Sequence, residues 1–209
     1  MKLEYLLKKR TTWLTGSGPE SDIVLSSRVR LARNLKDKKF ATRSPAETGR
    51  EIGGEILAAV EKISELKGAL VVEIDKTSEL DRQFLIERRL ASRELMGGKH
   101  GVLVIGEEEA VSLMINEEDH LRIQVLQPGL NLKQSWITAD RIDTEMEKIL
   151  SYEYSPVYGY LTACPTNVGT GLRASAMVHL PALVFDKQIN KILQTVGKLG
   201  LEVRGIYGE

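Results

Sequence analysis

GVLVIGEEEAVSLMINEEDHLRIQVLQ, residues 101–127, contains three apolar runs separated by two short acidic segments. The runs GVLVI, AVSLMI and LRIQVL are rich in Val, Ile and Leu, which favours strands. The segments GEEE and NEED are polar and short, as is typical of turns. Because such short connections join antiparallel neighbours, the stretch predicts a three-stranded antiparallel meander.

The segments on either side add strands and helices to this meander. DIVLSSRVRLARN (22–34) alternates in polarity and predicts a further strand that follows a Gly/Ser/Pro loop over 15–22. Helices are predicted over 46–66, 79–90, 134–150 and 186–199, short strands over 69–74 and 201–207, and a Gly- and Pro-rich loop system over 160–183. Strand groups joined by short turns, with helices between the groups, predict an α+β fold with a mainly antiparallel sheet flanked by helices.

The composition narrows the classes of partner. The 209 residues include 29 Lys+Arg and 29 Asp+Glu, so the formal charge is zero, whereas nucleic-acid-binding chains usually carry a positive surplus. The single cysteine, Cys164, excludes an internal disulfide and a multi-cysteine metal site. The charged amino terminus is a poor signal peptide and no apolar run reaches the ~20 residues of a membrane span. We therefore expect one domain, with two small ones as the alternative, in a cytoplasmic protein.

Two arginines in the first predicted strand are candidates for binding an anion. Arg28 and Arg30 fall on one side of the strand, about 7 Å apart along it. Their planar guanidinium groups can bind neighbouring phosphates bidentately, or they can simply face acidic residues at the surface. Arg33 falls on the opposite side, and we expect it to be structural.

The acidic turn NEEDHLR (116–122) places three carboxylates before an arginine. Adjacent acids repel each other unless a cation or a proton neutralises them, although a solvated acidic turn is the commoner explanation for such a cluster. Direct metal binding by all three is less attractive, because no fourth ligand with suitable spacing follows, and Mg²⁺ usually takes one or two carboxylates with phosphates and water.

The segment CPTNVGTGLR (164–173) is the most unusual part of the chain. Gly169 and Gly171 would let backbone amides approach a ligand closely, and Arg173 follows as a clamp residue. The segment lacks the Gly-Lys-Ser/Thr end of a Walker A loop. Taken alone, Cys164 would more often be an apolar filler than a reactive thiol.

Taken together, SSRVRLARN, NEEDHLR, CPTNVGTGLRAS and VRGIYGE resemble, in this order and spacing, the catalytic domain of the phosphagen (guanidino) kinases. The resemblance runs from about residue 13 onward and is nearest to the bacterial branch that phosphorylates arginine side chains in proteins. It implies a glutamine synthetase-like α+β catalytic domain over 1–209, without the all-helical N-terminal unit of small-substrate relatives. It also implies that the chain is truncated after Glu209.

The resemblance assigns roles residue by residue. Glu118 and Glu209 match the carboxylates that hold the substrate guanidinium, and Cys164 matches the cysteine beside it. Glu117 and Asp119 match residues that order the hydration shell of magnesium or support the turn. The arginines that match those around the phosphates of ATP are Arg28, Arg30, Arg122, Arg173 and Arg204.

The implied reaction is transfer of the γ-phosphate of MgATP to arginine side chains, with Mg²⁺ held through phosphates and water rather than by a protein metal site. Implied partners are proteins with exposed arginine, a small activator protein and protein-quality-control machinery, without nucleic acid or membrane. A dimer is expected only with the missing C-terminal region. The alternatives are a kinase for a free guanidino metabolite and a non-catalytic nucleotide- or phosphoarginine-binding module. Arg89 and Met177 stand where the family often has histidines, which bears on nucleotide affinity.

Overall fold

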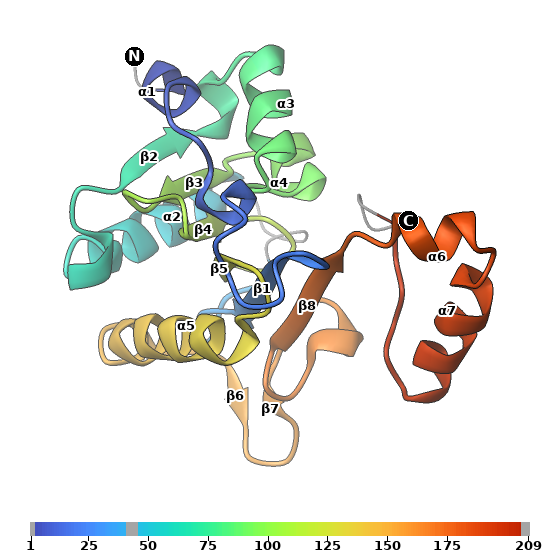
Figure 1. Ribbon diagram of the computed structural model, residues 1–209. Coiled ribbons are helices and arrows are strands. Elements are labelled where there is room, and N and C mark those ends of the chain that lie inside the picture. Colours follow the sequence, from blue (N-terminus) through green and yellow to red (C-terminus); the bar gives the residue numbers. More distant parts are fainter. Residues whose placement is uncertain (1–2, 41–45, 206–209) are drawn as a thin grey trace.

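A six-stranded antiparallel sheet forms the centre of the computed structural model, which describes residues 3–40 and 46–205 (Figure 1). In sheet order the strands are β2 (Leu70–Glu73), β3 (Val102–Ile105), β4 (Val111–Ile115), β5 (Leu121–Pro128), β1 (Val24–Arg33) and β8 (Leu172–Val178). Every pairing within this sheet is antiparallel. The predicted meander and the α+β class with a mainly antiparallel sheet are therefore confirmed.

Helices surround the sheet. They are α1 (Leu3–Leu7), α2 (Ala46–Val60), α3 (Glu79–Glu87), α4 (Arg93–Gly97), α5 (Leu132–Glu147), α6 (Pro181–Phe185) and α7 (Ile189–Lys198). Of these, α2, α3, α5 and α7 lie at the predicted places with shifted ends, whereas α1, α4 and α6 were not predicted. The helix predicted over 46–66 ends at Val60 and is followed by a 3₁₀ turn, Ser64–Leu66, in which Leu66 is still buried. In Figure 1, α6 and α7 (red) lie beyond β8, at the edge of the sheet opposite β2.

The two faces of the sheet are covered by different helices. One core joins α2 and α5 to the sheet, with Ile56 and Ile142 fully buried against residues such as Leu113. The other joins α1, α3 and α4 to Leu103 and to further residues of β3 and β4. The second group of helices covers only the β2–β3–β4 part of its face.

That second face changes from apolar to cationic across the sheet. Residues directly opposite in neighbouring strands share a face. One such line, read from β2 to β8, is Leu70, Ile105, Ser112, Gln124, Arg30 and Arg173. The apolar end lies in the core with α1, α3 and α4, and the cationic end extends beyond it. The fold therefore presents a charged surface on β5, β1 and β8.

The prediction was wrong at two places near the C-terminal end. The segment 160–183 begins in β7 (Gly159–Tyr160), which pairs with β6 (Tyr154–Ser155), and it also contains the regular strand β8 and the start of α6. The sequence of β8, LRASAMV, has three small residues at its centre, and it forms a strand by pairing with β1. The strand predicted over 201–207 does not form over 201–205, and its last two residues lie outside the described part.

Across the described residues, none of the helices combines the length and the apolar character required to cross a lipid bilayer.

Candidate active site

Four of the predicted phosphate-binding arginines lie on the cationic part of the sheet, here called the arginine face. Strand alternation puts Arg28 and Arg30 of β1 on this face, as the sequence predicts. Arg30 lies opposite Arg173 of β8, and Arg122 of β5 lies opposite Ala32 of β1. Because opposed side chains start about 5 Å apart, the guanidinium groups can converge on one ligand.

The two arginines of β1 are half-buried cations, and no described residue forms an ion pair with either. No hydrogen bond or ion pair reaches Arg28 or Arg30 from residues 3–40 and 46–205. Burial, followed by repulsion from Arg89 and Arg173, lowers the pKa of Arg28 to about 10. Burial and repulsion from Arg28 and Arg122 lower the pKa of Arg30 to about 9. Both groups stay protonated at neutral pH, so this surface favours a polyanion.

The third arginine is fixed in place by the acidic turn. Arg122 Nη1 donates to Glu117 Oε1, and Arg122 Nη2 donates to Glu118 Oε2 at 3.2 Å. Glu117 also accepts from the Ser92 hydroxyl, which caps the N-terminus of α4 through the Leu95 amide. The Glu117 side chain is fully buried and is therefore a support for Arg122.

The solvated acidic turn that such a cluster usually indicates is not what forms here. Glu117 and Asp119 are buried, while Glu118 alone of the three is partly exposed. Burial raises the pKa of Glu118, Arg122 lowers it, and the neighbouring Asp119 and Glu117 raise it further. Glu118 thus lies at the edge of the arginine face with a carboxylate that already binds one guanidinium.

The remaining two predicted arginines meet at a carboxylate that the sequence analysis did not consider. Arg173 Nη2 lies 2.9 Å from Glu202 Oε2, and Arg204 Nη2 lies 2.6 Å from Glu202 Oε1. All three side chains are exposed. Glu202 therefore brings Arg204 to the β8 side of the arginine face. Glu209, the second predicted carboxylate, lies outside the described residues.

The loop that carries Cys164 is attached to the acidic turn. The Ala163 amide donates to Asp119 Oδ1 at 2.7 Å, and the Cys164 Sγ lies 3.0 Å from the Thr166 hydroxyl. Gly171 has φ +64°, and a Cβ there would lie 2.5 Å from the Ala32 carbonyl oxygen. Glycine at this position is thus required for packing against β1, a different reason from the ligand approach that the sequence suggested.

Three further residues take positions that bear on the site. Arg33 lies on the opposite face, pairs with buried Asp143 and stacks over the Tyr160 ring, as expected of a structural residue. Arg89 has φ +61°, and its carbonyl accepts from Gln124 Nε2 at 2.8 Å. Gln124 lies on the arginine face, and the sequence analysis missed it. The alternation in LRIQVL predicts this position, because it puts Gln124 on the same side of the strand as Arg122.

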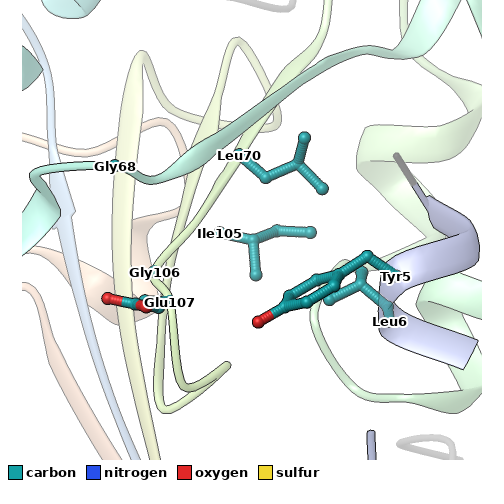
Figure 2. Close-up of a pocket in the computed structure, with 7 residues that line it drawn as sticks. All are labelled: Tyr5, Leu6, Gly68, Leu70, Ile105, Gly106 and Glu107. Carbon is teal, nitrogen blue, oxygen red and sulfur yellow. The ribbon is translucent and has the colours of Figure 1, made fainter. Parts of the chain in front are cut away.

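A pocket in the described part of the chain lies away from the arginine face. This open pocket of about 360 Å³ lies between α1 and the β2–β3 edge, lined by residues that include Tyr5, Leu70 and Ile105 (Figure 2). Glu107 is the charged residue at its rim. The lining has no cation to meet a phosphate, so the arginine face is the better candidate site.

The arginine face offers cationic groups suited to phosphate oxygens. Among the described residues, no group of three or more His, Cys, Asp or Glu could hold a metal ion. Arg28 and Arg30, which form no ion pair with a described residue, offer cations to phosphate oxygens.

Comparison with known proteins agrees with this geometry. The chain is 46% identical over its whole length to a protein-arginine kinase of Halothermothrix orenii and 48% identical, over 94% of its length, to one of Desulforamulus reducens. It spans 60% and 56% of those two proteins.

Solved structures of phosphagen kinases have the same fold. The substrate-free duplicated taurocyamine kinase of Schistosoma mansoni superposes with a TM-score of 0.77 at 26% identity, over 98% of this chain and 30% of that one. A lombricine kinase gives a TM-score of 0.77 at 28% identity, over 94% and 58%. Residues 51–209 match the family model of the ATP:guanido phosphotransferase C-terminal catalytic domain. With most of its length covered by that match, the chain belongs to the ATP:guanido phosphotransferase family.

Proposed function

We propose that this chain is the catalytic part of a protein arginine kinase, which transfers the γ-phosphate of MgATP to arginine side chains of other proteins. The observation that carries the proposal is the pair of half-buried cations Arg28 and Arg30, which form no ion pair within residues 3–40 and 46–205. They lie on the same sheet face as Arg122, which contacts Glu118. A polyanion site next to a carboxylate that binds a guanidinium is what the reaction needs.

The donor end of the site would act mainly by electrostatics. Charge accumulates on the transferred phosphoryl group and on the β-phosphate as the bond between them breaks. The guanidinium groups of Arg28, Arg30 and Arg122 would stabilise that charge from fixed positions, with Arg173 and Arg204 closing the β8 side. A Mg²⁺ ion bound with the nucleotide would supply further neutralisation of this charge.

The acceptor end would act by orientation and proton removal. An arginine side chain is protonated at neutral pH, and its delocalised lone pairs make it a poor nucleophile. Glu118, with Glu209 as the second carboxylate, would hold the guanidinium in plane and align one nitrogen with the γ-phosphorus. As the N–P bond forms and the bond to the ADP oxygen breaks, the carboxylate accepts the nitrogen's proton. The raised pKa of Glu118 suits it to accept that proton. Cys164 would lie beside the acceptor.

Protein arginine, rather than a free guanidino metabolite, is the proposed acceptor because the relatives at 46% and 48% identity are named protein-arginine kinases. The proposed cellular setting is the cytoplasm, with an activator protein and protein-quality-control partners of the whole protein.

Incubation with γ-labelled ATP and two acceptors, an arginine-rich test protein and free arginine, tests the proposal. Acid-labile, base-stable label on the test protein is expected, and Glu118→Gln should abolish it while ATP affinity stays within about twofold. Glu61→Gln, a change of an exposed glutamate after α2, is the matched control and should transfer normally. Label on free arginine alone would reject the protein acceptor, and ATP binding without label on either acceptor would favour a nucleotide-binding module.

A further inference from the structure

A set of buried hydrogen bonds joins three segments that are far apart in the sequence. Asn34, directly after β1, is 1% exposed. Its Nδ2 donates to Asp119 Oδ1 at 2.7 Å and to the Leu161 carbonyl at 3.1 Å. Its Oδ1 accepts from the His120 amide at 3.0 Å. Both ends of this one amide are therefore used, which fixes its orientation between the acidic turn and the Cys164 loop.

Asp119 is the second member of the set. It is fully buried, and its Oδ1 accepts from both Asn34 Nδ2 and the Ala163 amide. Ala163 precedes Cys164, and Asp119 follows Glu118, so one carboxylate oxygen connects the backbones of both proposed acceptor-site residues. Asp119 Oδ2 is buried without a hydrogen-bond partner in the described part of the chain.

The energetics indicate a role other than stability. A buried carboxylate whose contacts are neutral N–H groups and whose second oxygen is unpaired costs free energy relative to an apolar residue. His120 makes the arrangement rigid, because its Nδ1 accepts from the Leu35 amide and its Nε2 contacts the Lys39 carbonyl. A costly polar cluster that is rigidly held is suited to fixing geometry.

We infer that Asn34 and Asp119 form a positioning pair that sets Glu118 and Cys164 relative to the arginine face. The inference rests on the proposed function. Asn34 is attached to the strand that carries Arg28 and Arg30, and Asp119 to the turn that carries Glu118. The pair holds the Cys164 loop through the Leu161 carbonyl and the Ala163 amide. Neither residue touches the reacting atoms; both act through the groups they hold. Asp119 thereby supports the turn, one of the two roles that the sequence left open.

The decisive variant is Asn34→Asp, which keeps the shape of the side chain, removes both donated hydrogen bonds and places a second carboxylate against Asp119. Two readouts on the ligand-free chain need no turnover. Hydrogen exchange of the 160–168 segment should become about tenfold faster, because the Ala163 amide loses its fixed acceptor. Alkylation by iodoacetamide should become about fivefold faster, and it reports on one site because Cys164 is the single cysteine.

Measuring label transfer together with ATP affinity distinguishes a positioning role of the pair from a merely stabilising one. Label transfer to the test protein should fall about 100-fold in Asn34→Asp, since a displacement of about 1 Å has such an effect, while the ATP Kd stays within about twofold. The double variant Asn34→Asp with Asp119→Asn restores the hydrogen bond between the two side chains, though not the one to the Leu161 carbonyl, and should recover part of the lost transfer activity. Asn34→Ala, which removes the hydrogen bonds of the amide without adding a charge, should behave as Asn34→Asp if the latter folds poorly.

The matched control is Glu109→Gln, a buried carboxylate paired with Arg88 at the β3–β4 turn, away from the Cys164 loop. It should lower the Tm without accelerating exchange or alkylation. Unchanged exchange and alkylation in Asn34→Asp would overturn the inference, as would a loosened loop with undiminished transfer or no recovery in the double variant. If the wild-type chain transfers no label, that result counts against the proposed function alone. Hydrogen exchange and alkylation need no turnover, so they still test whether Asn34 and Asp119 act as a positioning pair.

Discussion

Replacing Arg30 by methionine should stabilise the nucleotide-free protein and weaken its binding of ATP. Methionine keeps an unbranched stem that can pack where the arginine stem packs, and it removes the charge. Arg30 lies two residues from Arg28 on β1, opposite Arg173 of β8 and next to the strand of Arg122, and it forms no ion pair with a described residue. Glu117 partly offsets this charge without a direct ion pair, and a bound polyanion would neutralise it further.

The magnitude follows from the pKa of the guanidinium. It falls from 12.5 to about 9, and at about 1.4 kcal/mol per pH unit the fold disfavours the charged form by at most about 5 kcal/mol. Partial exposure and solvent screening reduce this, so we expect a gain of about 1–3 kcal/mol in the free energy of unfolding. The same change removes charge-assisted hydrogen bonds worth about 1.5–3 kcal/mol, which is about 10- to 150-fold in the ATP Kd.

Thermal unfolding without nucleotide and a titration with ATP measure the two effects. The Tm should rise by about 3–10 °C, and the Kd should increase as stated. Arg50→Met, at an exposed position of α2, is the control and should change the free energy of unfolding by no more than about 0.5 kcal/mol. A loss of stability in Arg30→Met, with ATP affinity retained, would refute the reasoning, because it would show that Arg30 is a satisfied structural cation.

Three further predictions concern other parts of the molecule. The pKa of Glu118 is raised, chiefly by burial, so kcat/KM for the acceptor should decline on acidification at a pH above 4.5, and an unperturbed midpoint in a pH–rate profile would contradict this. Glu202→Gln should tighten ATP binding about two- to fivefold at low salt by releasing Arg173 and Arg204, which isothermal titration would detect; unchanged affinity would show that the exposed pairs are irrelevant. Ile56→Ala, at a fully buried position of α2, should cost about 2–5 kcal/mol in urea unfolding, and a smaller loss would mean that the core on that face collapses to fill the space.

Much of the architecture could be predicted from local patterns of apolar and polar residues in the sequence. The period-two alternation from residue 24 onward put Arg28 and Arg30 on one face and Arg33 on the other, because successive side chains of a strand point in opposite directions. The three apolar runs and two short turns of 101–127 determined an antiparallel meander. The family resemblance then assigned site roles to five arginines, to Glu118 and Glu209, and to Cys164.

Burial and long-range pairing were decided by the tertiary structure. The NEED segment has the composition of a solvated turn, and only the approach of Asn34, Ser92 and the 161–163 backbone makes Glu117 and Asp119 interior groups. The segment LRASAMV forms a strand because it pairs with the edge of β1. Glu202 forms ion pairs with two arginines from different segments, Arg173 and Arg204. A sequence determines local periodicity through backbone geometry, whereas strand register and the desolvation of a charge depend on which distant segments pack against it.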